Sequence, residues 1–171
     1  IPGGTRWPVT NDLISEFVDF EHDAQPLLDE FYQQRGYTVD RSKACKLFDV
    51  ILTRGEKSVK VEEKIRSHDY GDILLELVQD VDSGNPGWVS KTRCDYLVYA
   101  VVTNGQLLKV FVLTWMPFKN WLITEYFPGS SGKQATQYRW SARGYWVTLN
   151  AAIPITNIPP SYIQAFTATN L

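Results

Sequence analysis

The chain has 171 residues, 44% of which are hydrophobic, and a formal net charge of −2. This composition fits one globular domain over residues 1–171 and excludes a short peptide or a repeat array. A helix that spans a bilayer takes about 20 apolar residues, and no run in the chain approaches that length. We therefore expect a protein that has no membrane partner.

Charged residues are distributed unevenly along the chain. Residues 1–34 contain seven acids and one base, and residues 35–66 contain nine bases and five acids. Residues 126–171 contain three bases and no acid. A protein that is acidic overall can still present a basic face to a polyanion. A solvated surface of mixed charge is the ordinary alternative.

The first predicted element is a helix that begins near Thr10. Apolar side chains recur at helical spacing from Leu13 to Phe31, and Gly36 is a suitable residue for the helix end. Pro26 lacks an amide hydrogen, so it would kink or divide this segment. The pattern therefore predicts one long helix or two shorter ones.

Two apolar runs then predict a β-hairpin. Its first strand covers about residues 45–53, its second strand covers about residues 57–66, and the turn lies at Gly55. We expect both strands to be central in a sheet. A third run, from Gly71 to Asp80, has the composition of another buried strand.

The second half of the chain predicts two more strands joined by a turn. The runs DYLVYAVV and LLKVFVLTW flank Asn104-Gly105, which is the clearest hairpin signal in the sequence. A short helix with Pro117 near its start and a strand in YWVTLNAAIPI follow, and the tail after them is irregular. The state of WVSKTR, which precedes the two strands, stays open.

This order of elements predicts an α/β protein in which the N-terminal helix packs on a mixed central sheet. A C-terminal strand and an irregular tail complete it. We expect the core at about residues 10–125 and a C-terminal extension at residues 126–171. Cys45 and Cys94 have no metal-ligand spacing and lie in apolar surroundings, so we expect both to be buried free thiols of a cytoplasmic protein and not a disulfide.

The predicted hairpin carries charge where a buried strand would carry apolar side chains. Residues two apart in a strand share a face, so Glu62, Lys64 and Arg66 project together. Hairpin pairing can bring the carboxylate of Asp49 beside that of Glu62. Two adjacent carboxylates repel unless a proton or a cation lies between them. Mg²⁺ is a suitable cation, because it takes one or two protein carboxylates and keeps several waters.

The segments FDVIL and VEEKI resemble the motif of the PD-(D/E)XK nuclease superfamily. In both, an Asp on one strand is followed by a turn and by Glu-x-Lys on the next strand, after an acidic helix and before further strands. The resemblance covers roughly Phe20 to Val102, and Phe48 stands where the motif has Pro. It implies a restriction-endonuclease-like fold and metal-dependent hydrolysis of DNA.

The resemblance also implies roles for individual residues. Asp49 and Glu62 would bind the metal ion, Mg²⁺ or Mn²⁺, and the main-chain carbonyl of Glu63 would be a further ligand. Lys64 would orient water and stabilise the charge of the phosphorane. Many members add a glutamate from the first helix, for which Glu21 is the candidate, with Glu16 and Gln25 about one turn away.

Each of these assignments has a structural alternative. Asp49, Glu62 and Lys64 would otherwise form an ion-pair network across the hairpin. Glu21 would otherwise be an ordinary acid on a helix surface. Glu76 is a second acid in an apolar strand, and it either extends the metal site or pairs with a base of the hairpin.

Several basic residues are candidates for DNA contact. They are Arg66, Lys91, Arg93, Arg139 and Arg143. The last two are interleaved with the aromatic residues of YRWSARGYW, which suits a nucleic-acid surface, a dimer interface or a core edge. We expect a homodimeric endonuclease that acts on DNA. The alternative is a noncatalytic nucleic-acid-binding or assembly protein that keeps the nuclease fold.

Overall fold

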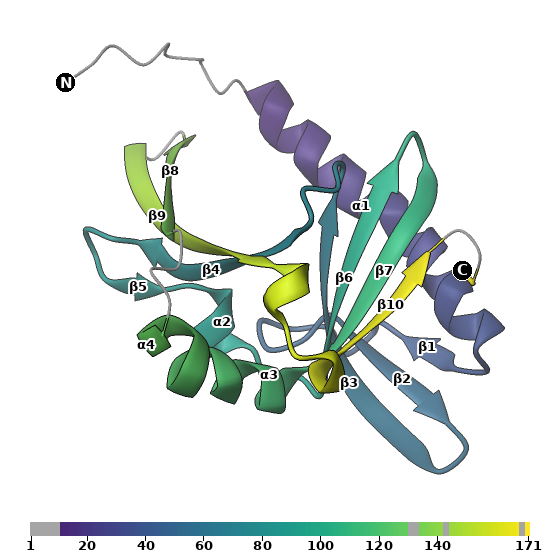
Figure 1. Cartoon of the computed structure of the whole chain (residues 1–171). Coiled ribbons are helices and arrows are strands. Elements are labelled where there is room, and N and C mark those ends of the chain that lie inside the picture. The colour runs from purple at the N-terminus through teal and green to yellow at the C-terminus, as the bar shows by residue number, and fades with distance from the viewer. Residues whose placement is uncertain (1–10, 130–133, 142–143, 168–169) are drawn as a thin grey trace.

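The computed structural model describes residues 11–129, 134–141, 144–167 and 170–171, and side chains within 20–129, 147–167 and 170–171. Helix α1 (Asn11–Gln34) contains Pro26 without being divided, so the single long helix is the correct alternative (Figure 1). Gly36 follows it with a φ of 80°, a left-handed conformation that ends many helices. The expected helix start at Thr10 lies outside the described residues.

The described part of the chain is a mixed α/β protein in which strands predominate. The strands are β1 (Thr38–Asp40), β2 (Val50–Arg54), β3 (Lys57–Arg66), β4 (Asp72–Asp80), β5 (Asn85–Pro86), β6 (Tyr96–Thr103), β7 (Gln106–Thr114), β8 (Gln134–Ser141), β9 (Gly144–Pro154) and β10 (Ile163–Thr167). The helical segments after α1 are α2 (Trp88–Lys91), α3 (Trp115–Trp121), a π-helical turn (Leu122–Tyr126), α4 (Phe127–Gly129) and two 3-10 turns (Ile155–Asn157 and Pro160–Tyr162). None of the described helices is both long and apolar enough to cross a bilayer.

The larger sheet contains β1, β2, β3, β6, β7 and β10 in that order. Adjacent strands in this sheet are antiparallel, with the exception of β3 and β6. These two strands are parallel and are joined by a crossover through β4, β5 and α2. The β6–β7 hairpin turns at Asn104 and Gly105, whose φ values are 51° and 70°. Two positive φ values are what a tight Asn-Gly hairpin turn requires, so this prediction is confirmed.

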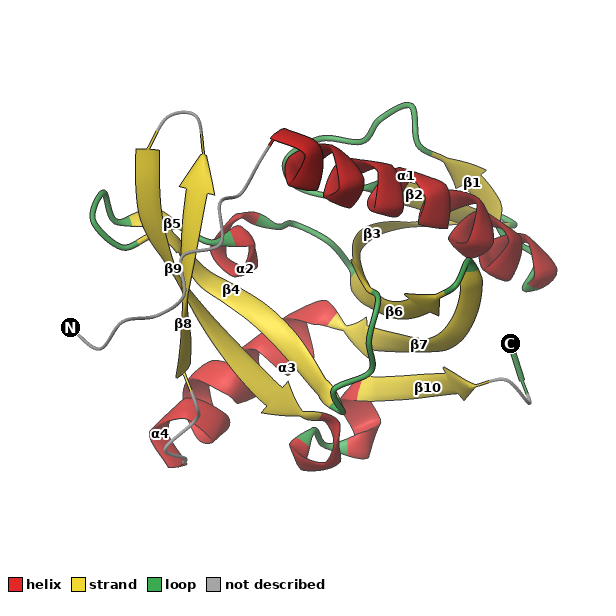
Figure 2. Ribbon diagram, turned by 90° about the horizontal axis from the view of Figure 1, so that it is seen from above, coloured by secondary structure: helices red, strands yellow, loops and turns green. Residues whose placement is uncertain are grey.

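The smaller sheet contains β5, β4, β9 and β8 in that order. The strand predicted at residues 71–80 is present as β4, and it pairs with β9. Figure 2 shows these two strands running side by side away from the larger sheet. The predicted mixed central sheet with the N-terminal helix packed on it is confirmed by the larger sheet and α1, whereas the second sheet was not predicted. Periodicity identifies a strand without naming its partner, and no local turn joins β4 to β9.

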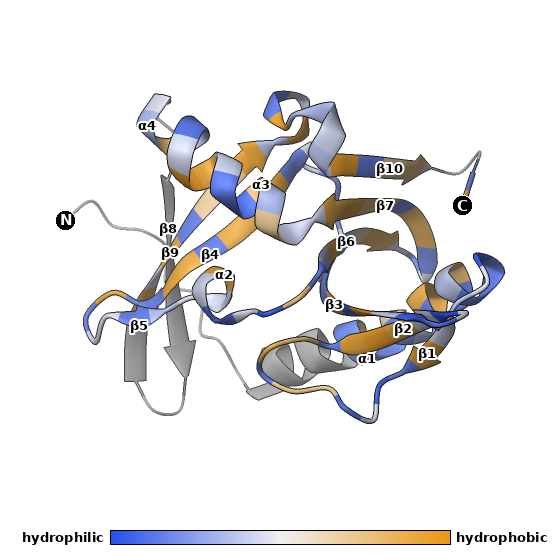
Figure 3. Ribbon diagram, turned by 90° about the horizontal axis from the view of Figure 1, so that it is seen from below, coloured by the Kyte–Doolittle hydropathy of each residue, from blue (hydrophilic) through white to orange (hydrophobic). Residues whose placement is uncertain are grey.

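One apolar core lies between the two sheets and α3. Leu75 and Ile153 of the smaller sheet, Leu97 and Leu113 of the larger sheet, and Phe118 of α3 all belong to it and are at most 1% exposed. Figure 3 shows the orange, hydrophobic residues that follow β4 along this layer. Complete burial of a side chain of this size contributes about 1.5–3 kcal/mol, so this contact holds the two sheets together.

A second core lies between α1 and the opposite face of the larger sheet. Leu28 and Phe31 of α1 pack there with Val61, Val98 and Val110. One face of β3 therefore packs against α1. The other face of β3 continues the face of β6 whose side chains enter the first core. Alternate side chains of β3 enter two different environments as a result.

The C-terminal region contributes strands to both sheets. The expected late strand is present as β9, which completes the smaller sheet. The irregular tail is wrong over residues 163–167, because β10 pairs with β7 at the edge of the larger sheet. Pro159 and Pro160 interrupt the pattern just before β10, and an edge strand needs only one partner to form.

The two cysteines are free thiols, as expected, but their burial differs. Cys94 is buried, whereas Cys45 is exposed, so the prediction of burial is wrong for Cys45. Cys45 forms an isolated bridge with Phe48 ahead of β2 and does not lie in an apolar strand. Burial raises the pKa of the Cys94 thiol to about 11, which makes it a poor nucleophile near neutral pH.

Candidate functional site

The candidate site lies where β2 begins beside the middle of β3. Val50 pairs with Val61, which places Asp49 opposite Glu62 and one residue ahead of β2. The Asp49 amide donates a 2.9 Å hydrogen bond to the carbonyl of Val61. The predicted strand over residues 45–53 is thus too long, since residues 45–48 close a turn, and Asp49 stands at a strand start.

The carboxylate of Asp49 fastens the start of β2 to β3. Its Oδ2 accepts a 2.7 Å hydrogen bond from the amide of Glu63. Among the described residues, no cation forms an ion pair with Asp49, and Lys64 and Arg66 pair with other carboxylates. Asp49 is therefore not the counter-ion of either base.

Glu62 is buried, with 6% of the residue exposed. Its Oε1 lies 2.6 Å from the ammonium of Lys64, and its Oε2 lies 3.4 Å from the hydroxyl of Thr92. Burial raises the pKa of Glu62, the charge of Lys64 lowers it, and the charge of Asp49 raises it, so that the net shift is upward. The ionised carboxylate is incompletely compensated, and a further cation would stabilise it.

Lys64 and Glu62 are supported by α2 and the residue after it. The Lys64 ammonium lies 4.9 Å from the centre of the Trp88 ring, and the Lys64 side chain remains 30% exposed. The Thr92 hydroxyl donates a 2.8 Å hydrogen bond to the carbonyl of Leu47 and also contacts Glu62. From the sequence, the secondary structure of this segment stayed open. The contacts of Trp88 with Lys64 and of Thr92 with Glu62 were not predicted, because no motif marks either residue.

Gly87 lets α2 approach β4 closely. Its amide donates a 3.0 Å hydrogen bond to the carbonyl of Leu77, and a Cβ atom at this position would lie 2.1 Å from the carbonyl oxygen of Glu76. Only glycine fits such an approach, which sets the position of Trp88. Glu76 itself lies opposite Asn150 in the smaller sheet and has no ion pair with a base among the described residues.

Glu63 points away from Glu62, toward α1. Its carboxylate accepts a 2.8 Å hydrogen bond from the Tyr32 hydroxyl and bonds of 2.8 and 3.1 Å from Arg41. Arg41 also pairs with Asp29 at 2.6 Å. Burial lowers the pKa of Arg41, but its bonds to the two acids outweigh this effect and raise the pKa above its ordinary value. The side chain of Glu63 belongs to this closed network.

The main chain of Glu63 faces the candidate site. The amide and the carbonyl of one residue in a strand point to the same side. Because the Glu63 amide bonds to Asp49, the Glu63 carbonyl is directed to the side on which Asp49 lies. The carbonyl can therefore join the two carboxylates of Asp49 and Glu62, while the Glu63 side chain cannot.

Arg66 lies two residues beyond Lys64 on the same face of β3. Its guanidinium pairs with Asp72 at 2.7 Å and lies 4.5 Å from the centre of the Tyr70 ring. Tyr70 is 64% exposed, which leaves an aromatic ring on the surface beside this base. The predicted face of Lys64 and Arg66 is confirmed, and Arg66 has a carboxylate partner there.

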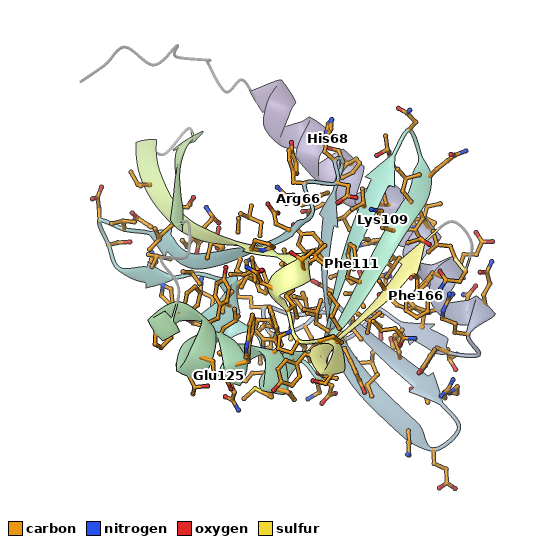
Figure 4. All side chains as sticks on the ribbon, viewed as in Figure 1. Arg66, His68, Lys109, Phe111, Glu125 and Phe166 are labelled. Atoms are coloured by element: carbon orange, nitrogen blue, oxygen red, sulfur yellow. The ribbon has the colours of Figure 1, made fainter. Side chains whose placement is uncertain are left out.

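Glu21 lies on the exposed surface of α1 near the end of β3. A hollow of about 410 Å³ is lined by Glu21 together with Arg66 and His68. Figure 4 shows Arg66 and His68 beside the N-terminal half of α1. The side chain of Glu16, one turn earlier, lies outside the described residues, while Gln25 is half-buried. Glu21 is thus brought near Arg66, and no described contact joins it to the acids of the hairpin.

The other candidate DNA contacts lie on and after α2 and in β8. Lys91 donates a 2.8 Å hydrogen bond to Gln79, and Arg93 donates to two carbonyl oxygens of its own turn at 3.1 Å. Neither has a carboxylate partner among the described residues. Arg143 lies outside the described residues, and only the backbone of Arg139 is described.

Comparison with known proteins adds no family to this geometry. No protein-family model and no curated protein sequence matches the chain. Among the described residues, no group of three or more His, Cys, Asp or Glu side chains is placed to hold a metal ion. Any metal site at the hairpin would therefore use fewer side chains, together with main-chain oxygen and water.

Proposed function

We propose that the protein is a DNA endonuclease that hydrolyses phosphodiester bonds with Mg²⁺. The observation that carries the proposal is the buried carboxylate of Glu62, which lies opposite Asp49 and beside Lys64. These are the side chains that the resemblance to PD-(D/E)XK nucleases assigns to catalysis. Hydrolysis of a phosphodiester needs an activated water and compensation of the charge that develops on the phosphate, and this trio suits both needs.

A restriction-endonuclease-like fold is part of the proposal. The Asp before β2 and the Glu-x-Lys of β3 follow an acidic helix and precede further strands of the larger sheet, which is the order that the resemblance implies. The smaller sheet is additional to that order. It packs through its apolar face on the larger sheet and leaves the start of β2 next to α2.

The oxygen atoms at the hairpin fit Mg²⁺. Asp49 and Glu62 supply two carboxylates, and the Glu63 carbonyl is directed to the same side as Asp49. Mg²⁺ commonly binds through one or two protein carboxylates and keeps several waters, so it does not need a cage of three side chains. Mn²⁺ accepts similar oxygen ligands and is the expected substitute.

Each residue of the site has a distinct part in the proposed reaction. Mg²⁺, when bound, supplies a more acidic bound water and neutralises charge on the phosphate. The ammonium of Lys64 lies beside Glu62, from where it can donate to a phosphate oxygen or a water as negative charge develops. Thr92 and Trp88 are positioning residues, because they act through Glu62 and Lys64.

DNA would approach along the face of β3 that carries Lys64 and Arg66. Lys91 and Arg93 have no carboxylate partner among the described residues and would contact phosphates. Arg66 is paired with Asp72, so its contact with DNA would compete with that ion pair. Glu21 would add a carboxylate from α1.

A homodimer completes the proposal. One site hydrolyses one strand, so a double-strand or junction cutter usually presents two sites related by a twofold axis. The region from Tyr126 to Trp146, which includes Arg139 and Arg143, is the proposed interface or DNA surface. Light scattering that finds only monomer, with and without DNA, would count against the dimer.

The free thiols suit a reducing compartment, and we place the protein in the cytoplasm.

A noncatalytic nucleic-acid-binding or assembly protein is the second candidate. The 2.6 Å contact between Lys64 and Glu62 favours it, because this pair compensates charge without a metal ion. However, burial still raises the pKa of Glu62 despite Lys64, with a further contribution from Asp49. A carboxylate that remains under-compensated fits a cation site better than a structural ion pair.

Cleavage assays on variants of two adjacent glutamates test the proposal. Supercoiled plasmid, single-stranded DNA and branched DNA are each incubated with Mg²⁺, Mn²⁺ or EDTA. We expect the wild type to cut at least one substrate with metal and none with EDTA, and Glu62→Gln to lose about 10²-fold or more in rate. Glu63→Gln is the matched control, because it makes the same change on the other face of β3, and it should stay within a few-fold of wild type.

Two outcomes would contradict this assignment. Absence of cleavage by the wild type on all three DNAs, together with retained binding in a gel-shift assay, would favour the noncatalytic candidate. Equal losses in Glu62→Gln and Glu63→Gln would remove the distinction between the two faces of β3. Circular dichroism of both variants checks that the fold is retained.

A further inference from the structure

A cavity lies on the opposite face of the larger sheet from Glu62. Its volume is about 580 Å³, and Leu52, Val61 and Phe31 are among its lining residues. These three side chains belong to the core on the α1 side of the sheet, so the cavity is separate from the proposed nuclease site. Sites for small molecules commonly have volumes of about 300–1,000 Å³.

The lining of this cavity is largely aromatic and aliphatic. The rings of Phe31, Tyr37, Tyr96 and Phe166 line it, as does Val59. Phe31 and Phe166 pack edge to face with their ring centres 5.2 Å apart, which joins α1 to β10, where Figure 4 labels Phe166. Rings fixed in this way offer a preformed surface to the apolar body of a ligand.

Three cations line the same cavity, and the described lining residues include no acid. They are Arg35, Arg54 and Lys57. Arg35 donates to two main-chain carbonyls, that of Phe31 at 3.0 Å and that of Asn170 at 2.7 Å. Among the described residues, no carboxylate forms an ion pair with any of the three. The described lining of the cavity therefore carries positive charge that no described carboxylate balances.

The two arginines are held by aromatic rings. The Arg35 guanidinium lies 3.7 Å from the centre of the Phe31 ring and 4.6 Å from that of Phe166. The Arg54 guanidinium lies 4.8 Å from the Tyr37 ring centre, and its NH1 donates to the Arg35 carbonyl at 3.4 Å. A guanidinium held over a ring has five N–H groups, and those that do not bond to the carbonyls named above can donate to an anion. Burial lowers the pKa of Arg35, and a bound anion would oppose that shift.

We propose that this cavity binds a small organic anion, a carboxylate, sulfonate or phosphate attached to an apolar body. The anionic group contacts Arg35 and Arg54, with Lys57 adding to the local positive charge. The apolar body fills the space over Leu52 and Val59. This inference does not rest on the proposed nuclease function, because it uses other residues on the other face of the sheet.

A pair of fluorescent probes that differ in one charged group tests the proposal on the full chain. The sulfonate 8-anilinonaphthalene-1-sulfonate carries the anion, and N-phenyl-1-naphthylamine lacks it. We expect saturable binding of the sulfonate at one site and binding at least about tenfold weaker for the neutral probe, since a charge-assisted contact is lost. Decanoate and phenyl phosphate should both displace the sulfonate, which tests the shared anion chemistry.

Variants locate the binding. The double change Arg54→Gln/Lys57→Gln should weaken the sulfonate by about tenfold or more and leave the neutral probe within about twofold. The double change Lys43→Gln/Lys46→Gln removes the same charge from exposed positions outside the cavity and is the matched control. Val59→Trp fills the cavity and should weaken both probes. If Val59→Trp fails to fold by circular dichroism, the two charge variants decide alone.

Three results would overturn the proposal. The first is the absence of saturable binding of the sulfonate to wild type. The second is equal weakening by the two charge variants, which would indicate a general electrostatic effect. The third is loss of the near-ultraviolet circular dichroism of the wild type when the sulfonate is added, because the probe would then report exposed core.

Discussion

Glu62 and Glu63 are neighbours in β3 whose carboxylates lie on opposite faces of the strand in opposite environments. Glu63 is enclosed by the Tyr32 hydroxyl and the Arg41 guanidinium on the α1 side. Glu62 faces the other way, and burial keeps its pKa raised even though Lys64 lowers it. The alternation of a strand thus gives two identical residues different roles, one structural and one proposed to bind metal.

The first prediction concerns the contribution of the network around Glu63 to the stability of the fold. Arg41→Ala leaves the carboxylate of Glu63, a residue that is 8% exposed, without its cation, so we expect a loss of about 3–5 kcal/mol in the free energy of unfolding. Glu63→Gln combined with Arg41→Ala removes the stranded charge and should recover part of that loss. Urea denaturation measures all three proteins. Lys43→Ala, an exposed base in the same loop, should change the free energy by at most about 0.5 kcal/mol. A double variant as unstable as Arg41→Ala alone would contradict this account.

The second prediction concerns Asp49→Asn. Asp49 has no ion pair among the described residues, and an asparagine can still accept the hydrogen bond from the Glu63 amide. Removal of its repulsion with Glu62 should leave the melting temperature in EDTA equal or higher. Cleavage and any stabilisation by Mg²⁺ should be lost.

Thermal melts of wild type and Asp49→Asn, each in EDTA and in Mg²⁺, give the measurement. A structural ion-pair role for Asp49 would instead cost about 3–5 kcal/mol on its removal. If Asp49→Asn melts well below wild type in EDTA, and Mg²⁺ raises neither melting temperature, the metal site must be abandoned.

The local parts of the fold could be predicted because local chemistry determines them. The strand at 57–66 and the turn at Asn104-Gly105 are both confirmed, since apolar alternation and paired positive φ values leave signals in consecutive residues. The pairing of β4 with β9 and of β7 with β10 could not be predicted. Each pairing joins distant segments and depends on how the whole core packs.

The predictable part of the candidate site is the part that follows from the alternation of side chains along β3. The shared face of Lys64 and Arg66, and the opposite direction of Glu63, follow from a period of two. The partners from elsewhere, Arg41 and Thr92, had no signal. A buried acid implies that some partner exists but does not identify it. The catalytic and metal-binding roles stay predictions.

The third prediction is that the free energy of unfolding depends on pH through Glu62. Its pKa is raised in the folded protein by burial, Lys64 lowers it in part, and Asp49 raises it further. The folded state therefore binds this proton more tightly than the unfolded chain, and that stabilisation is lost as pH rises through the raised pKa. Without metal, the stability of Glu62→Gln relative to wild type should therefore increase as the pH rises above about 4, near the ordinary pKa of glutamate.

Urea denaturation in EDTA across this pH range measures the difference between the two proteins. Glu56→Gln, at an exposed turn position, is the control and should show no such trend. A constant difference between wild type and Glu62→Gln at all pH values would mean that the carboxylate is already fully compensated by Lys64.

The fourth prediction concerns Gly87, which brings α2 against β4. A Cβ atom would lie 2.1 Å from the carbonyl oxygen of Glu76, and backbone must shift to admit it. We expect Gly87→Ala to destabilise the protein by about 1–3 kcal/mol or more and to change the fluorescence of Trp88. Gly129→Ala is the control, because a Cβ there meets nothing within 4 Å. Equal melting temperatures for the two variants would contradict the close approach.

The last prediction compares two lysines on one face of β3. Lys64→Ala should reduce cleavage by about 10²–10³-fold, because the ammonium is proposed to act on charge that develops in the transition state. Lys60→Ala makes the same change four residues earlier, at an exposed position opposite Ile51, and should stay within a few-fold of wild type. Calorimetric titration with Mg²⁺ should find binding to both variants, since Asp49 and Glu62 remain. Activity of Lys64→Ala within a few-fold of wild type, or equal losses in both variants, would remove Lys64 from the proposed mechanism.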